Sequence, residues 1–130
     1  MSSVFTKIMN QELPGHFVYE DDQCIVIMTI EPINPGHVLV IPREEINHWV
    51  DLPEALASHL MLVSQRTAKA VQSVFPAKRI GMSIVGIEVP HVHIHLCPIN
   101  GVSDMNFANA CAETAEVLAD HAQQLSALMQ

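Results

Sequence analysis

The segment His91-Val92-His93-Ile94-His95-Leu96-Cys97 constrains the fold more than any other part of the chain, because histidine and apolar residues alternate along it. Side chains of a β-strand point alternately to opposite faces of a sheet, so the alternation predicts a strand over residues 91–97 with one apolar face. Neighbouring histidines would share the other face, about 6.6 Å apart at roughly 3.3 Å per residue. The chain therefore needs a sheet that presents a row of imidazoles.

The remaining pattern predicts short strands and helices around that row. Ser2 or Ser3 can cap a short N-terminal helix. A long central helix of about six turns is predicted from Asp51, because Asp51 and Glu54 have the spacing of a capping box. Further strands are predicted over residues 16–19, 23–30, 37–41 and 79–85, and a last helix over about residues 104–128. This order predicts an α+β domain with a mainly antiparallel five-stranded sheet in each protomer.

Composition limits the class of protein. Apolar residues make up 49% of the 130 residues and charged residues 15%, the opposite of a disordered chain. Uninterrupted apolar stretches such as Cys24–Met28 are far shorter than the roughly 20 residues of a membrane span. The first residues lack the basic and apolar regions of a signal peptide, so we expect a cytoplasmic protein without a membrane partner. A net charge of −8 argues against a basic surface for nucleic acid.

The residues alone leave three interpretations of the histidine row open. The histidines can be partly exposed residues on a sheet face, with no chemistry. An adjacent pair can bind a metal ion with a third ligand from His37, His48 or Glu88, whereas the whole row is too widely spaced for one ion at Zn–N distances of about 2.0–2.1 Å. The third interpretation is nucleophilic catalysis at phosphorus, in which a neutral imidazole attacks and its neighbours act as acid–base partners.

Four segments in order resemble the landmarks of the histidine triad (HIT) superfamily of nucleotide hydrolases and transferases. They are Val4–Ile8, Val18–Asp22, Asn34–Arg43 and Gly86–His91, and the histidine row follows them. The resemblance covers roughly residues 3–98, and the helix predicted over residues 104–128 fits it more loosely. It implies a single HIT domain over residues 1–130 and a homodimer that pairs through the central helix and an edge strand.

The resemblance implies an enzyme that acts at the alpha-phosphate of a nucleoside phosphoramidate or a related nucleotidyl compound. It implies that His93 takes the nucleotidyl group and that His95 helps to protonate the leaving group before water releases the nucleotide. His91 and His37 are implied as the other active-site histidines. The residues implied around a purine nucleotide or nucleotidyl conjugate are Phe5, Ile8, Ile27, Ile30, Thr29 and Glu88.

The chain departs from the family pattern at three polar positions. Thr29 stands where an aspartate usually holds the ribose hydroxyls, and Ile80 and Ile87 stand where an amide side chain is usual. A carboxylate can accept hydrogen bonds from both hydroxyls, whereas one threonine oxygen offers less. We therefore expect either weak binding of the nucleotide or a natural ligand that is not an ordinary ribonucleotide. The departures leave a second function open, a slow or inactive nucleotide-binding module that retains the triad.

A structural zinc site found in many bacterial family members is also altered. Its cysteine pair corresponds to Ser3 and Thr6, so His48 and His91 lack thiolate partners. Because imidazoles alone make a poor closed zinc site, we predict no structural metal and no cofactor.

Overall fold

The computed structural model describes residues 2–130 of the chain. The helices are α1 (Val4–Met9), α2 (Glu54–Val74) and α3 (Ala115–Leu128). The strands are β1 (Phe17–Glu20), β2 (Cys24–Met28), β3 (Val38–Pro42), β4 (Arg79–Ser83) and β5 (Ile94–Ile99). Short 3₁₀ turns lie at Trp49–Asp51, Val102–Asp104 and Phe107–Asn109. No helix in this described part is long and apolar enough to cross a membrane.

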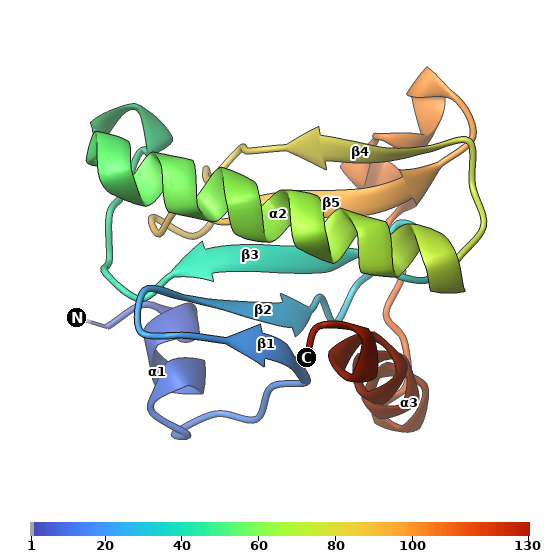
Figure 1. The fold of residues 1–130 in the computed structure, drawn as a ribbon, viewed down its shortest axis with the longest axis horizontal. Coiled ribbons are helices and arrows are strands. Elements are labelled where there is room, and N and C mark those ends of the chain that lie inside the picture. The colour runs from blue at the N-terminus through green and yellow to red at the C-terminus, as the bar shows by residue number, and fades with distance from the viewer. Residues whose placement is uncertain (1) are drawn as a thin grey trace.

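The strands form one five-stranded sheet in the order β1-β2-β3-β5-β4, with every neighbouring pair antiparallel (Figure 1). This confirms the α+β fold predicted from the sequence. Every residue of β2 and β3 is buried, as their β-branched and apolar side chains favour. β3 pairs with β5 through Leu39 and His95. The histidine row therefore ends near the middle of the sheet, beside the residue that precedes β3, His37.

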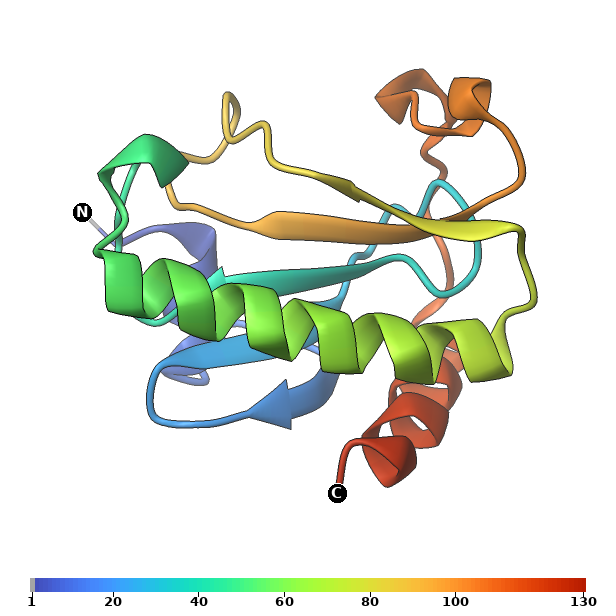
Figure 2. The same cartoon turned by 45° about the horizontal axis from the view of Figure 1, so that its top comes forward.

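Different helices cover the two faces of the sheet. α2 runs across one face and α3 packs beside it (Figure 1), and the core on this side includes Val26, Val40, Leu60, Leu96 and Leu125. α1 lies behind the sheet, as Figure 2 shows, in a second core made of Phe5, Ile8, Ile25, Ile27, Leu39 and Ile41. Because Leu96 faces α2, strand alternation turns His95 toward the face that carries α1.

The strand that carries the histidines begins later than the alternation predicts. β5 starts at Ile94, and the residues before it follow a bend. The His91 N–H donates to the Val89 carbonyl at 2.8 Å, and the Val92 N–H donates to the Ile46 carbonyl at 2.8 Å. These bonds to loop residues replace a strand ladder, so His91 and His93 lie outside the regular strand.

Two predicted helix starts are wrong. α2 begins at Glu54 with Pro53 as its N-cap and no side-chain hydrogen bond there, because Asp51 belongs to the preceding 3₁₀ turn. α3 begins at Ala115, capped by the Thr114 hydroxyl, rather than near residue 104. The Cys111 and Glu113 N–H groups donate to the Pro32 and Ile30 carbonyls at 3.2 and 3.1 Å. That long-range pairing keeps residues 110–113 out of the helix, which sequence periodicity does not reveal.

Candidate active site

His93 lies at the centre of the candidate site with one ring nitrogen engaged. Its Nδ1 is 2.7 Å from the His91 carbonyl oxygen, which can only accept, so Nδ1 carries the proton. The neutral ring then keeps its lone pair on Nε2. The Phe5 ring packs against it with 4.8 Å between centroids, and the side chain is 8% exposed. The local backbone thus selects the tautomer in which Nε2 is a nucleophile.

His95 and His37 form a second hydrogen-bonded unit next to His93. The Ile33 N–H donates to His37 Nδ1 at 3.0 Å, so the proton of neutral His37 is on Nε2. That Nε2–H donates to His95 Nδ1 at 3.0 Å, which leaves the His95 proton on its own Nε2. The rings of His93 and His95 are in edge contact, 4.9 Å between centroids. His93, whose Nε2 is an acceptor, and His95, whose Nε2–H is a donor, are therefore neighbours in the row.

His91 is the most deeply placed histidine of the row. It is fully buried, with Nε2 2.7 Å from the Pro42 carbonyl oxygen and Nδ1 2.6 Å from Ser3 Oγ. Its ring meets Phe5 edge-on at 5.7 Å. Burial therefore decreases along the row, from buried His91 to half-buried His95. The row is not a set of partly exposed histidines on a sheet face, as the first interpretation proposed.

Burial favours the neutral form of His37, His93 and His95 near pH 7. It lowers the pKa of His37 to about 4. Burial also lowers the pKa of His95 to about 3, and repulsion from a charge on His93 or His37 adds to the effect. The pKa of His93 is lowered by burial as well, although its hydrogen bond to the His91 carbonyl opposes this. Neutral imidazole is the form that attacks phosphorus, so the electrostatics match the tautomers.

A pocket of about 300 Å³ opens over the reactive histidines. Its lining residues are Val85, Gly86, Ile87, Glu88, Val89, His93, His95 and Phe107. The Phe107 ring meets His95 edge-on at 4.7 Å and is 41% exposed. Sequence reasoning missed Phe107, because apolar spacing placed it inside a helix. The signal that could have found it is Asn106, whose side chain accepts from the Ala108 N–H and caps a short turn.

Comparison with known proteins identifies the family. The HIT domain model matches residues 10–101. The chain belongs to the HIT family. An uncharacterized HIT-like protein from Borreliella burgdorferi is 31% identical over 102 residues, 73% of each protein. A crystal structure of a HIT-like protein involved in cell-cycle regulation from Bartonella henselae, with an unknown ligand, matches with a TM-score of 0.84 and 29% identity over 98% of this chain and 96% of the other. A zinc-bound histidine triad family protein from Mycobacterium smegmatis matches with a TM-score of 0.82 and 26% identity, covering 99% and 94%.

The expected HIT nucleotide residues divide into two groups in this structure. Phe5, Ile8 and Ile27 are buried together in the core under α1, and of these Phe5 touches His93. Glu88 is exposed and lines the pocket. Thr29 follows β2, and its N–H donates to the His37 carbonyl at 3.3 Å. The structure thus brings His93, His95 and Glu88 to one pocket and places the apolar group and Thr29 outside its lining.

Ile80 and Ile87, which replace polar residues of the family, and Ile30, which is expected as an apolar wall, lie in different settings. Ile80 packs against the core under α2, on the face of the sheet opposite His95, so its side chain is not at the site. Ile87 is 85% exposed at the pocket, and Ile30 is 65% exposed. The expectation that Ile80 removes a contact from the site is therefore wrong, because its side chain lies on the other face of the sheet. Ile30 as an apolar wall of the nucleotide site stays a prediction.

The residues at the positions of the HIT zinc site have other hydrogen-bond partners in this structure. The Ser3 hydroxyl lies 2.6 Å from His91 Nδ1, so the nitrogen that a metal would need already has a partner. His48 Nδ1 accepts from the Val50 N–H at 3.4 Å, where it caps a 3₁₀ turn. Hydroxyls are weak replacements for thiolates as zinc ligands. The residues at these positions do not fit a closed zinc site.

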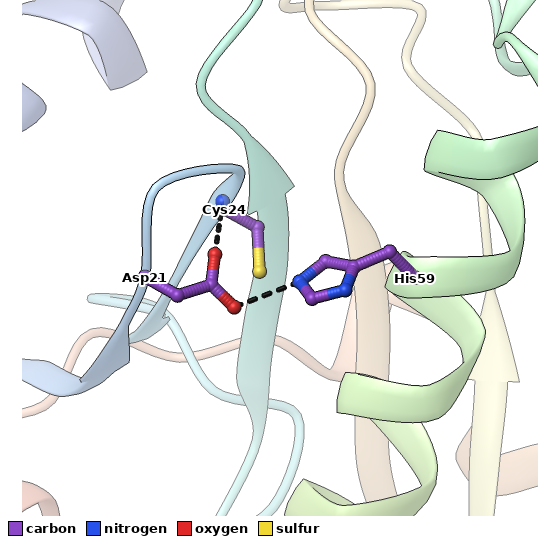
Figure 3. A group of neighbouring side chains, drawn as sticks. All are labelled: Asp21, Cys24 and His59. Carbon is purple, nitrogen blue, oxygen red and sulfur yellow. Dashed lines mark hydrogen bonds and ion pairs between the residues drawn. The ribbon is translucent and has the colours of Figure 1, made fainter.

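Another group, Asp21, Cys24 and His59, has ligand-type atoms within 4.8 Å of one another (Figure 3). Both carboxylate oxygens are already engaged. Oδ1 accepts from the N–H groups of Gln23 and Cys24 at 2.8 Å each, and Oδ2 lies 2.8 Å from the Tyr19 hydroxyl and 2.7 Å from His59 Nε2. Burial raises the pKa of the Cys24 thiol to about 12. We interpret this group as a contact that ties α2 to the turn between β1 and β2.

Proposed function

We propose that this HIT domain is a nucleotide-binding hydrolase that cleaves a nucleoside phosphoramidate or a related nucleotidyl compound at its alpha-phosphate. One observation carries the proposal. The hydrogen bond from His93 Nδ1 to the His91 carbonyl leaves His93 Nε2 unprotonated, beside a pocket and next to His95. A positioned, neutral imidazole is an effective nucleophile at phosphorus.

The reaction would run in two steps at the phosphorus atom. His93 Nε2 forms a bond to phosphorus as the bond from phosphorus to the amine nitrogen breaks, and the amine leaves with one added proton. Water then attacks the same phosphorus, the bond to His93 breaks, and the water gives up one proton. The protons consumed and released balance, so one group that lends and recovers a proton is sufficient.

We assign that proton transfer to His95. Its pKa of about 3 reflects burial in the ligand-free protein, and the negative charge of a bound phosphate would raise it. His95 would thus take up a proton at Nδ1 with the substrate, in place of the hydrogen bond from His37 Nε2–H. It would then pass its Nε2 proton to the leaving amine and recover a proton there from the attacking water. The pocket walls of Val85, Val89 and Phe107 support a substrate with an apolar surface beside its phosphate, as in a purine nucleotide or nucleotidyl conjugate.

A slow or inactive nucleotide-binding module is the second candidate. Ile87 favours it, because an apolar side chain that is 85% exposed supplies no hydrogen bond at the mouth of the pocket. Thr29 favours it too, since it would hold a ribose less firmly than a carboxylate. Turnover separates the two candidates.

Mass spectrometry of the protein mixed with adenosine 5′-phosphoramidate tests the proposal. We expect a nucleotidyl adduct on the peptide that carries His93, together with continued release of AMP. The His48→Ala variant changes an exposed histidine outside the pocket and should behave as the wild type. AMP release in less than one equivalent favours the binding module, and an adduct on another residue contradicts the assignment of His93.

We also propose a homodimer. β4 is an edge strand of the sheet, and the nearby α2 carries exposed apolar side chains. Met61 and Leu62 are 54% and 59% exposed on α2, and Met82 is 43% exposed on β4. Pairing of two copies through these elements would cover both surfaces. Light scattering at micromolar concentration should give twice the mass of the 14.3 kDa chain, and a monomer mass would contradict the proposal. A cytoplasmic location stays a prediction from the sequence.

A further inference from the structure

Three residues at the positions of the HIT zinc site, Ser3, Thr6 and His91, form a hydrogen-bonded cluster with Glu45. We call Ser3, Thr6, Glu45 and His91 the N-terminal corner. Ser3 Oγ is 2.6 Å from His91 Nδ1, and the Thr6 N–H donates to Ser3 Oγ at 3.1 Å. The Thr6 hydroxyl donates to Glu45 Oε1 at 2.6 Å, and the Ser3 N–H donates to the same oxygen. The corner thus connects the start of α1 to the loop after β3 and to the histidine row.

Each proton position in the corner is determined by its neighbours. The Pro42 carbonyl can only accept, so His91 Nε2 carries the proton of the neutral ring. His91 Nδ1 is then an acceptor, and the Ser3 hydroxyl must donate to it. The Ser3 oxygen in turn accepts from the Thr6 N–H. Ser3 is therefore the donor that completes the hydrogen bonding of a fully buried imidazole.

The corner reaches the nucleophile through one residue. The His91 carbonyl accepts the Nδ1 proton of His93, the bond that leaves His93 Nε2 free. The Phe5 ring, two residues after Ser3, packs against both His91 and His93. A shift of His91 would therefore move both the acceptor of His93 and the ring beside it.

We propose that Ser3 is a positioning residue for His93, acting through His91. Its hydroxyl fixes the tautomer and place of His91, and the His91 carbonyl fixes the tautomer and place of His93. The N-terminal corner does with hydrogen bonds what a metal ion would do by binding His91. This inference rests on the proposed function for its catalytic consequence, and its structural part can be tested without a substrate.

Four variants test whether Ser3 positions His91 or only helps to hold α1 against the rest of the protein. Ser3→Ala removes the donor to His91, whereas Ser3→Thr keeps a hydroxyl and a helix cap. Ser3→Cys keeps the volume and replaces the hydroxyl by a weak donor, which provides a test if Ser3→Ala does not fold. Thr6→Val is the matched control. It removes the hydroxyl that is bonded to Glu45 and lies 3.4 Å from Ser3 Oγ, and it keeps the N–H bonded to Ser3. The corner is loosened, but the bond from Ser3 to His91 is kept.

The first measurement is nitrogen-15 NMR of the histidine rings in the ligand-free protein. In the wild type, Ser3→Thr and Thr6→Val, we expect His91 protonated at Nε2 and His93 at Nδ1. In Ser3→Ala, and to a smaller extent Ser3→Cys, we expect a mixture of tautomers or shifted signals at both rings. Unchanged signals of His91 and His93 in Ser3→Ala and Ser3→Cys would overturn the proposal, whatever the enzyme does.

The second measurement is turnover of adenosine 5′-phosphoramidate. Misplacement of a reacting group by about 1 Å can cost about 100-fold, so we expect a partial shift in Ser3→Ala to lower kcat about tenfold with little change in KM. Ser3→Thr should restore kcat. An equal loss in Thr6→Val would overturn the proposal, because the effect would then come from docking of α1. A wild type without turnover would contradict the proposed function alone, and the NMR measurement would still decide the role of Ser3.

Discussion

The histidine row and the contact between Asp21 and His59 use the same side chain in opposite electrostatic settings. In the row and at His37 beside it, the hydrogen-bond partners are backbone groups, a hydroxyl and another imidazole, none of them a carboxylate. At Asp21, the partner of His59 is a carboxylate whose own pKa is held well below its usual range (Figure 3). Burial raises the pKa of Asp21, but hydrogen bonds from Gln23, His59, Tyr19 and Cys24 outweigh it.

An imidazole with neutral partners and an imidazole with a carboxylate partner are suited to different roles. Neutral partners fix the orientation and tautomer of an imidazole without charging it, which suits a nucleophile. A carboxylate that accepts hydrogen bonds from several elements holds those elements together, as Asp21 does for α2 and the turn after β1. We therefore expect changes in the row to alter activity first, and changes at Asp21 to alter stability first.

The largest expected effect is that of His93→Ala on turnover. We expect a loss of more than about a thousandfold, because the variant has no group to form the covalent intermediate. The protein should still fold. Its free energy of unfolding should drop by about 1–3 kcal/mol, since His93 is buried against Phe5 and its hydrogen bond is lost. This cost is larger than the roughly 0.5 kcal/mol of a surface substitution, because the side chain is buried.

Steady-state kinetics and urea unfolding of His93→Ala and His48→Ala provide the check. His48 caps an exposed turn, so its variant should keep full activity. Retention of more than a few per cent of activity in His93→Ala would place the nucleophile elsewhere and remove the contrast between the two regions.

Acid titration of stability should separate the regions by pH. The pKa of His37 is lowered to about 4, so the unfolded chain binds protons there before the folded protein does. Stability is therefore lost as pH falls from about 6.5 toward 4, by on the order of 2–3 kcal/mol at about 1.4 kcal/mol per unit of pKa difference. Asp21 has the opposite sign of charge and a lowered pKa. Its contribution is present above about pH 4 and is lost below that value as the carboxylate is protonated.

Urea unfolding at a series of pH values, in the wild type and in His37→Gln, measures the loss of stability in the pH ranges of His37 and Asp21. The variant should remove the share of His37 from the slope between about pH 6.5 and 4, whereas the shares of His93 and His95, whose pKa values are also lowered, should remain. His48→Gln, which changes an exposed imidazole, should follow the wild type. A slope in His37→Gln equal to that of the wild type would mean that His37 does not contribute to the acid sensitivity.

Asp21→Asn should affect stability and leave activity unchanged. An amide cannot accept on both sides from the four donors around Asp21, so we expect a loss of about 1–3 kcal/mol in the free energy of unfolding. Asp22→Asn is the matched control, because Asp22 is the exposed neighbour. Urea unfolding and kcat of both variants provide the check. A fall in kcat of Asp21→Asn would show that the two regions are coupled.

Sequence patterns predicted the features that depend on residues close together in the chain. They missed the features that depend on contacts with backbone segments far away in the sequence. Strand alternation placed His95 opposite Leu96, and apolar spacing found the long helix α2. The depth of His91 was not predictable, because it depends on Ser3 and Pro42, which approach it only in the fold. The position of Phe107 was missed for the same reason, since residues 110–113 pair with the loop after β2. The site histidines could be named from the resemblance, whereas their tautomers needed the hydrogen bonds.

The smallest effect is expected from Thr29→Asp, which would give the row a carboxylate neighbour of the kind that His59 has. The Thr29 N–H already bonds the His37 carbonyl, so residue 29 is at the edge of the row. Hydrogen bonds to charged groups contribute about 1.5–3 kcal/mol, and repulsion of the ligand phosphate removes part of it. We expect AMP to bind about tenfold more tightly, or about 1.4 kcal/mol, in calorimetric titration. Thr29→Asn, which adds no charge, should show less gain, and 2′-deoxy-AMP should not gain, because one of the two ribose hydroxyls is missing. Equal gains for AMP and 2′-deoxy-AMP would mean that residue 29 is not at the ribose, and that the carboxylate acts on the imidazoles of the row.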